Sequence, residues 1–368
     1  MGRPRELLIA SMIISAYLFF SWRMNAKEET TVSRREGKKI GEKRSNTGGQ
    51  KPENRKALVK TARGDVTFEE LDDKVYKPMG FEITKFYVPV PMVKPIEPMV
   101  CKKVFDEWME IAEKEQPPLP PRRIRPEQMD EFLLNGYASV RWIYRDDRDS
   151  PSGEKPRLWQ NMTAIMAKSP NRLASYGIAG LSVNHAMSYV GLKGLRGFVV
   201  GSMKPWVEAF ALHAGAVHVL TVEYNKLDID PKFRDRMSHI FPVDFAQNWK
   251  NYAGTFDFAA TFSSIEHSGM GRYGDPIDPS GDLKEMQKIH CMLKPGGLLF
   301  LGMPQGTDHI TYNLHRIYGP IRLGLMFAGY EWVHTFSGKS SFPIEVDAEA
   351  FRTSTGVHVQ RTFVLRKI

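Results

Sequence analysis

The feature that most constrains the fold is a regular alternation of short apolar strands with helices, which begins at Gly194 and continues to the end of the chain. Strands are predicted over residues 197–200, 217–222, 239–242, 256–262 and 298–303. Helices are predicted from Pro205, over WVEAFALHAGA, and over residues 283–293. Such alternation is typical of a parallel sheet with crossover connections. Residues 333–336 and 357–366 can add a final antiparallel pair, so the sequence predicts an α/β fold with a mostly parallel sheet.

The residues just after each predicted strand are candidates for a ligand site, because open parallel sheets bind ligands outside the carboxyl ends of their strands. Gly201 and Ser202 follow the first strand, and Glu223 and Tyr224 follow the second. A glycine lets the backbone approach a ligand closely, and a carboxylate about twenty residues later can accept both hydroxyls of a ribose. Only Gly201 remains of a GxGxxG loop, and a solvated strand-end glutamate is the alternative interpretation of Glu223.

Further candidate residues and motifs accompany the third, fourth and fifth predicted strands. Asp244 and Phe245 follow the third strand, FDFAATFSSIEH contains the fourth, and LKPGGLLFLGMP contains a turn and the fifth. This ordered set resembles the class I S-adenosylmethionine-dependent methyltransferase fold, a Rossmann-like, three-layer αβα fold with a seven-stranded sheet. The first loop, VVGSMKPW, departs from that family because it lacks the usual acidic residue and glycine-rich run.

The resemblance implies S-adenosylmethionine as the cofactor. The methionine part would face the loop after the first strand, the ribose hydroxyls the acid after the second, and the adenine the residues after the third. The cofactor-binding residues implied in this way are Gly201, Ser202, Glu223, Tyr224, Asp244, Phe245 and Ser263.

A narrower resemblance covers roughly residue 158 to the carboxyl end. SSIEHSGMGRYGDPIDPSGDL, together with PWVEAFALHAGA, TVEYN and NLHRIYGPIRL, looks like domain of unknown function 268, a methyltransferase-like family expanded in Caenorhabditis. No reaction is attached to that family. The resemblance therefore says more about fold than about function.

The segment after the fourth strand is the position from which class I methyltransferases address the acceptor. Removal of a hydroxyl proton needs a base, and His267 is the natural candidate, with Glu266 or Asp275 able to orient its imidazole. The predicted catalytic residues are His267, Glu266, Asp275, Tyr273 and His315, with Arg272 and Arg316 nearby. The same side chains could instead be a structural network that holds a long loop. A metal site from His267, Asp275, Asp278 and Asp282 is a further alternative, but its spacing matches no known loop.

The amino-terminal part predicts a membrane segment and a polar stem. LLIASMIISAYLFFSW has sixteen residues without a charge, so a helix would span about 24 Å, against about 30 Å for the hydrocarbon core. Residues 1–22 are predicted to be a signal anchor, or alternatively a cleaved signal peptide. Residues 23–63 are predicted to be a disordered stem with thirteen basic and five acidic side chains, a net charge of +8 out of +9 for the chain. Because the remainder is nearly neutral, nucleic acid is not expected as a partner.

An extended and helical arm is predicted over residues 64–157, followed by the methyltransferase-like domain over residues 158–368. Helices are predicted over residues 101–115, 126–147, 158–167 and 179–190. Cys101 and Cys291 permit at most one internal disulfide, and Cys291 is expected in the core.

These observations favour a membrane-anchored, single-pass methyltransferase that acts on a hydroxyl or carboxylate of a small molecule or glycan. A catalytically silent domain for binding or scaffolding is one alternative, and a lumenal glycosyltransferase that uses Asp228 and Asp230 is another. The layout of anchor, stem and domain fits a folded domain in the Golgi lumen. The charges that flank the predicted anchor slightly favour a cytoplasmic domain. Asn161-Met162-Thr163 is a glycosylation sequon that matters only if the body is lumenal.

Overall fold

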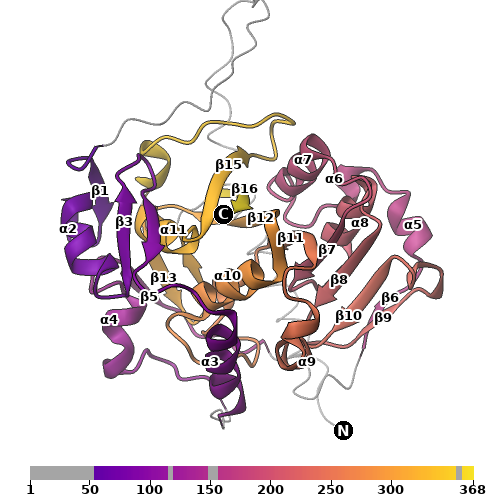
Figure 1. The fold of residues 1–368 in the computed structure, drawn as a ribbon, viewed down its shortest axis with the longest axis horizontal. Helices are drawn as coiled ribbons and strands as arrows, with labels where there is room; N and C mark the ends of the chain where they lie inside the picture. Colours follow the sequence, from indigo (N-terminus) through magenta and orange to yellow (C-terminus); the bar gives the residue numbers. More distant parts are fainter. Residues whose placement is uncertain (1–53, 115–118, 148–155, 354–358) are drawn as a thin grey trace, which may run out of the picture. The chain divides into compact units, whose positions relative to one another are not determined.

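A seven-stranded sheet lies at the centre of the computed structural model, which describes residues 54–114, 119–147, 156–353 and 359–368 (Figure 1). The strand order is β10-β8-β7-β11-β12-β16-β15. The first five of these strands pair in parallel, and β16 runs antiparallel to β12 and β15. The strands are β7 (Arg196–Val200), β8 (His218–Val222), β10 (Met237–Ile240), β11 (Phe256–Phe262), β12 (Leu293–Gln305), β15 (Tyr330–Phe336) and β16 (Val359–Lys367). The predicted α/β fold with a mostly parallel sheet is confirmed.

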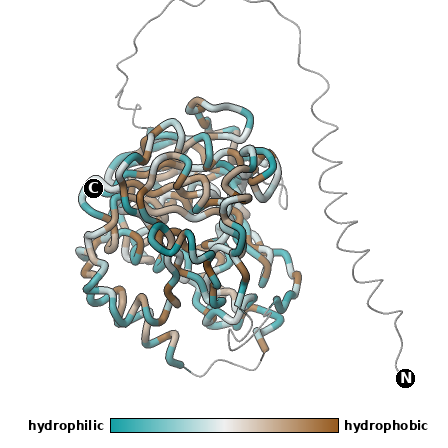
Figure 2. The backbone as a smooth tube through the Cα atoms, turned by 90° about the vertical axis from the view of Figure 1, so that its right-hand side faces the viewer, coloured by the Kyte–Doolittle hydropathy of each residue, from teal (hydrophilic) through white to brown (hydrophobic). Residues whose placement is uncertain are grey.

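Alternating side chains fill both faces of this sheet. Phe198 of β7 and Leu299 of β12 belong to one hydrophobic cluster, whereas their neighbours Val199 and Phe300 belong to another. One face is covered by α7 (Leu181–Val190) and α8 (Trp206–His213). The other is covered by α3 (Cys101–Glu113), α9 (Pro242–Gln247), α10 (Gly281–Met292) and α11 (Pro320–Met326). Figure 2 shows hydrophobic stretches within the folded body and hydrophilic ones on its outer loops.

The amino-terminal arm packs against the domain through the larger hydrophobic cluster. Its elements are β1 (Leu58–Thr61), β2 (Gly64–Thr67), α2 (Phe68–Leu71), the π-helix η1 (Asp72–Tyr76), β3 (Phe81–Lys85) and β4 (Met92–Pro95). The buried hydroxyl of Tyr76 donates to the carbonyl of Ile321 in α11 at 3.1 Å. The predicted stem extends to residue 63, but the structure pairs β1 with β2, so the last ten residues of that range belong to the folded body. The predicted anchor and residues 23–53 of the stem lie outside the described residues.

The helix predicted over residues 126–147 is wrong beyond Phe132. A short 3-10 helix, η2 (Pro126–Gln128), continues into α4 (Met129–Phe132), and the chain then forms β5 (Ser139–Trp142). Leu134, Asn135 and Gly136 all have positive φ, which ends the helix. β5 pairs in parallel with β13 (His309–Tyr312), which pairs with β14 (His315–Ile317), so a contact distant in sequence decides its conformation.

The helix predicted over residues 158–167 also begins as a strand. β6 (Arg157–Trp159) pairs with β9 (Leu227–Ile229), and α5 (Met162–Met166) starts after Asn161, whose φ is +58°. In contrast, α3 and α7 confirm the helices predicted from residues 101 and 179. The remaining short helices are α6 (Pro170–Leu173), η3 (Pro231–Phe233), η4 (Trp249–Asn251), η5 (Ile265–His267) and η6 (Glu349–Phe351). None of the helices that the structure describes is long and apolar enough to cross a membrane.

A disulfide joins Cys101 at the start of α3 to Cys291 near the end of α10, with their Cα atoms 5.7 Å apart. Cys291 is buried, as predicted. Around this bridge, Phe105 stacks on Trp249 with ring centroids 5.3 Å apart, and the Lys288 ammonium lies 3.8 Å from the Trp108 ring centroid. The disulfide therefore ties the arm to the domain within a packed interface.

Candidate functional site

The strand order reverses between β7 and β11, and the loops that follow these two strands touch each other. Gly201 has φ +69°, and a Cβ added to it would lie 1.9 Å from Oγ of Ser264. Only glycine fits both this conformation and this contact. The structure therefore brings the predicted loop after the first strand against the predicted loop after the fourth, at the position where open α/β sheets bind ligands.

Glu223, at the end of β8, fastens the first loop. Its Oε2 accepts a hydrogen bond from the backbone N–H of Ser202 at 2.9 Å, and its Oε1 accepts from the backbone N–H and the side-chain amide of Asn225 at 3.0 and 3.1 Å. The side chain is 8% exposed. A carboxylate offers about four acceptor positions, so about one is free. Both hydroxyls of a ribose could bind here only if one existing hydrogen bond were displaced.

A second carboxylate under this loop was missed in the sequence interpretation. Glu208 lies in the first turn of α8 and is fully buried. Its oxygens accept from the hydroxyls of Ser202 and Thr221, both at 3.0 Å. Burial raises the pKa of Glu208 to about 7. The available signal was a single acid within the apolar run WVEAFAL, because an acid there has to be buried with the helix.

The two residues predicted to contact the adenine, Asp244 and Phe245, have different environments. Phe245 is buried, with its ring centroid 5.9 Å from that of Phe198 and 4.9 Å from that of Tyr252. Because α9 begins at Pro242, Phe245 lies one turn into the helix on the face that packs against the sheet. The ring of Phe245 thus has a role in the core, and its contact with the adenine stays a prediction. Asp244 is exposed in the first turn of α9, and Tyr224 is 46% exposed just after β8.

A buried polar cluster lies at the end of β11. Ser263 has φ +51°, donates to Oε1 of Glu266 at 2.7 Å and accepts from the side-chain amide of Gln360 at 3.1 Å. Glu266 is 2% exposed, and its other oxygen, Oε2, has no hydrogen-bond partner among the described residues. Burial raises the pKa of Glu266 to about 7.

His267 is oriented by a backbone carbonyl. Its Nδ1 lies 2.6 Å from the carbonyl oxygen of Leu314. Because a carbonyl only accepts, Nδ1 carries the proton and Nε2 keeps the lone pair. Burial, followed by the nearby Arg272 charge, lowers the pKa of His267 to about 3, so the ring is neutral at pH 7. The predicted orientation by Glu266 or Asp275 is wrong, since the Leu314 carbonyl holds Nδ1.

Tyr273 and His315, two further predicted catalytic residues, lie beside this imidazole. The ring centroid of Tyr273 is 5.2 Å from that of His267, and that of His315 is 6.4 Å from it. Burial raises the pKa of Tyr273 to about 12, so its hydroxyl keeps its proton at neutral pH. The structure thus brings these three residues together next to Glu266.

Asp275 holds the loop that contains it. Its carboxylate accepts from the backbone N–H groups of Met270, Gly271 and Tyr273 at 2.9, 3.0 and 3.2 Å. Arg272 in the same loop is paired with Asp147, with nitrogen to oxygen distances of 2.6 Å. For these two side chains, the geometry fits the alternative of a structural network.

Arg316 also has a structural environment. It is 2% exposed and donates to the carbonyls of Ser268 and Pro279 at 2.6 and 3.0 Å. Asp282 is fully buried and forms an ion pair with Arg322. Asp278 pairs with Lys284 at 2.7 Å. These contacts occupy the side chains of the alternative metal site, and the described ranges contain no group of three or more His, Cys, Asp or Glu that could hold a metal ion.

Asp228 and Asp230 do not form a paired site. The Asp230 carboxylate caps η3 by accepting from the backbone N–H of Lys232, and it accepts from the N–H of Met162, both at 3.0 Å. Asp228 pairs with Arg234 at 3.6 Å. Both carboxylates thus have structural partners.

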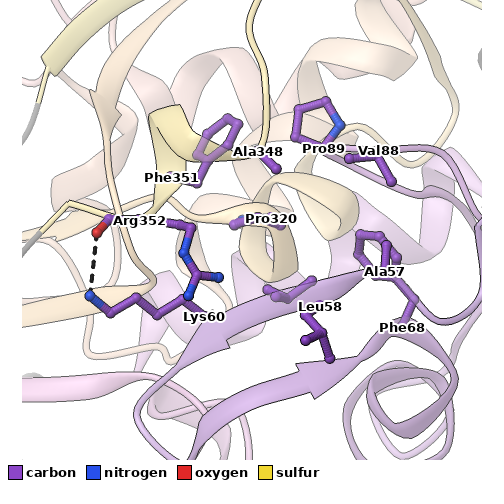
Figure 3. A pocket seen from close by; sticks show the side chains of 11 residues that line it. Ala57, Leu58, Lys60, Phe68, Val88, Pro89, Pro320, Ala348, Phe351 and Arg352 are labelled. Atoms are coloured by element: carbon purple, nitrogen blue, oxygen red, sulfur yellow. Dashed lines mark hydrogen bonds between the residues drawn. The ribbon is translucent and has the colours of Figure 1, made fainter.

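A separate shallow hollow lies between the arm and α11 (Figure 3). It encloses about 280 Å³ of space, part of which is open solvent. Apolar side chains form most of its walls, and Lys60 donates across it to the carbonyl of Arg352 at 3.3 Å. It contains none of the predicted site residues.

Residues 194–368 match the family described as "Caenorhabditis protein of unknown function, DUF268". The predicted family resemblance is confirmed over these residues. The DUF268 match begins at the turn before β7 and includes all seven strands of the central sheet. A search of curated proteins finds no significant match.

Several solved structures resemble the chain at low identity. A Burkholderia thailandensis 1,6-didemethyltoxoflavin-N1-methyltransferase, with bound 1,6-didemethyltoxoflavin and S-adenosylhomocysteine, is 16% identical, covers 50% of this chain and 78% of its own, and has a TM-score of 0.34. A putative sarcosine dimethylglycine methyltransferase from Galdieria sulphuraria is 12% identical, with coverages of 51% and 82% and a TM-score of 0.34. An S-adenosylmethionine-dependent methyltransferase from Mesorhizobium loti is 15% identical, with coverages of 52% and 100% and a TM-score of 0.31.

Proposed function

We propose that residues 158–368 form a class I methyltransferase domain that uses S-adenosylmethionine and acts on a hydroxyl or carboxylate of a small molecule or glycan. The observation that carries the proposal is the contact between Gly201 and Ser264, where the strand order reverses. This contact places the loop after β7, Glu223 and the cluster around Glu266 along one edge of the sheet. The seven-stranded order with its antiparallel pair supports the same proposal.

The cofactor would lie against Gly201, Ser202 and Glu223. It supplies an electrophilic methyl group on a sulfonium. Two features of the chain fit such a ligand: the glycine permits close backbone approach, and Glu223 has about one acceptor position free. Release of the Ser202 N–H from Glu223 would free a second position on the carboxylate. The same N–H would then be available to an acceptor group of the ligand.

We place the proton acceptor at Glu266 and not at His267. Methyl transfer from a sulfonium to a hydroxyl would form an oxygen–carbon bond, break the sulfur–carbon bond with S-adenosylhomocysteine as the leaving group, and release the hydroxyl proton, which needs a base. A group with a pKa near 7 suits that task at neutral pH, and Glu266 has such a pKa as well as one oxygen without a partner. His267 stays neutral and can accept a hydrogen bond at Nε2, which would help to align the acceptor.

Calorimetric titration of the full chain with S-adenosylmethionine and S-adenosylhomocysteine tests the proposal. We expect micromolar binding of both, with loss of binding in Glu223→Ala. Asp228→Ala is the matched control, because it removes a carboxylate that pairs with the exposed Arg234 outside the site. A folded wild-type protein that binds neither compound would refute the proposal.

A catalytically silent domain is the second candidate, and one observation favours it. The hydrogen bonds that Glu223 accepts from Ser202 and Asn225 occupy most of the acceptor positions that a ribose would need. If these hydrogen bonds are not exchanged for a ligand, the titration gives no heat while the protein keeps its fold. The glycosyltransferase alternative has no comparable support, because Asp230 serves as a helix cap.

A further inference from the structure

The disulfide is the first of two observations that point to a modification site. Cys101 and Cys291 are the only cysteines of the chain, and they pair although 190 residues separate them. Structural disulfides form and persist in oxidising compartments and are rare in the cytosol. The pairing therefore indicates that the folded body matures in the lumen of the secretory pathway.

The second observation is the environment of Asn161, which begins the chain's one Asn-X-Ser/Thr sequence. Both Asn161 and Thr163 are exposed, whereas Met162 between them is fully buried. Asn161 has φ +58° and makes no side-chain capping bond to α5. Among the described residues its amide caps no helix, so a substituent there would remove no capping contact from α5.

The neighbours of this tripeptide fix it on the surface. The backbone N–H of Met162 donates to the buried carboxylate of Asp230 at 3.0 Å, and β6 pairs with β9 just before the tripeptide. Figure 1 shows α5 at an outer edge of the folded body. A bulky, solvated group at Asn161 would project outward and leave both of these contacts intact.

We propose that Asn161 carries an N-linked glycan, added in the same oxidising lumen in which the Cys101–Cys291 bridge forms. The co-reactant is an oligosaccharide linked to a lipid through pyrophosphate. A bond forms between Nδ2 of Asn161 and the anomeric carbon of the sugar, the Nδ2 proton is lost, and the lipid pyrophosphate leaves. This proposal does not depend on methyltransferase activity.

Expression of the full chain in animal cells, followed by immunoblotting with and without an endoglycosidase for N-glycans, tests the site. We expect one mobility step for the wild type and none for Asn161→Gln or Thr163→Ala. Thr163→Ser is the matched control: it retains the hydroxyl that the sequence requires and should retain the step. An unshifted wild type, or a shift that persists in Asn161→Gln, would overturn the assignment.

Thiol labelling tests the compartment by a separate readout. A thiol-reactive polymer added to denatured, unreduced cell extract should leave the wild-type protein unlabelled, and labelling after reduction should add two polymer chains. Labelling of both cysteines before reduction would overturn the oxidising compartment. Because neither test uses a methyltransferase ligand, failure here is distinguishable from failure of the proposed function.

Discussion

Glu266 is the residue on which the proposed chemistry depends. We expect Glu266→Gln to lower transfer of labelled methyl groups from S-adenosylmethionine to a cell extract by roughly 100-fold or more, because general bases typically contribute that much. Wild-type activity should rise with pH up to about 7, as the carboxyl group with its raised pKa ionises. Titration with S-adenosylhomocysteine should still show binding in the variant.

His267→Ala provides the comparison for this prediction. If His267 only aligns the acceptor, its removal should lower the rate and leave the rise of activity through pH 7 in place. A pH profile that loses this rise in His267→Ala and keeps it in Glu266→Gln would contradict the assignment of the base.

Glu208 predicts a pH dependence of stability. Its folded pKa of about 7 lies above its ordinary value of 4.5, so the folded state binds the proton more tightly. The resulting stabilisation is full below pH 4.5 and is lost as pH rises to about 7, a change of up to about 3 kcal/mol. Glu208→Gln should remove this loss. The free energy of unfolding of the variant, relative to that of the wild type, should therefore increase between pH 5 and pH 7. Urea denaturation measures the difference, and parallel curves for the two proteins would contradict it.

At the scale of elements, the contact between the loops after β7 and β11 predicts that two glycine substitutions lower the free energy of unfolding by different amounts. Gly201 and Gly296 have similar positive φ values, +69° and +74°, but only Gly201 lacks room for a Cβ. Gly296→Ala should lower the free energy of unfolding by about 1–2 kcal/mol, because a residue with a Cβ disfavours this left-handed conformation. Gly201→Ala should cost clearly more, because the new methyl group meets Ser264.

Urea denaturation of both glycine variants measures this difference, and a double variant isolates its cause. Gly201→Ala combined with Ser264→Gly should restore most of the stability that the contact with Ser264 removes. The loss that comes from the positive φ should remain. Equal destabilisation by Gly201→Ala and Gly296→Ala would show that the two loops do not touch.

The bridge between α3 and α10 should stabilise the fold. Replacement of both Cys101 and Cys291 by serine is expected to lower the free energy of unfolding by roughly 2–5 kcal/mol, because the bridge closes a long loop in the unfolded chain. Thermal unfolding with and without a reductant measures this. The reductant should destabilise the wild type and leave the double variant unchanged, and an unchanged wild type would contradict the bridge.

Elements with a strong local pattern could be predicted from the sequence. The apolar run of β11 was placed at its observed bounds, and the helical spacing around Val104, Phe105 and Trp108 located α3. β5 could not be located, because pairing with β13, more than 150 residues later, overrides the helical pattern of its own segment.

In the candidate site, too, some features could be predicted from the sequence and others depend on distant contacts. The positions of Gly201 and Glu223 after their strands follow from the order of elements. Their contacts do not: the hydrogen bond from Ser202 to Glu223, the Leu314 carbonyl at His267 and the burial of Phe245 all depend on how distant segments pack. The pairing of the two cysteines likewise required the meeting of α3 and α10.

At the scale of the whole molecule, we expect the loops after β7, β8 and β11 to form a single ligand-binding edge. Hydrogen exchange of the full chain with and without S-adenosylhomocysteine tests it most directly. We predict slower exchange at the amides of residues 201–204, 223–225 and 263–267 when the ligand is present. Unchanged exchange at all three segments, or protection confined to other parts of the chain, would contradict the claim.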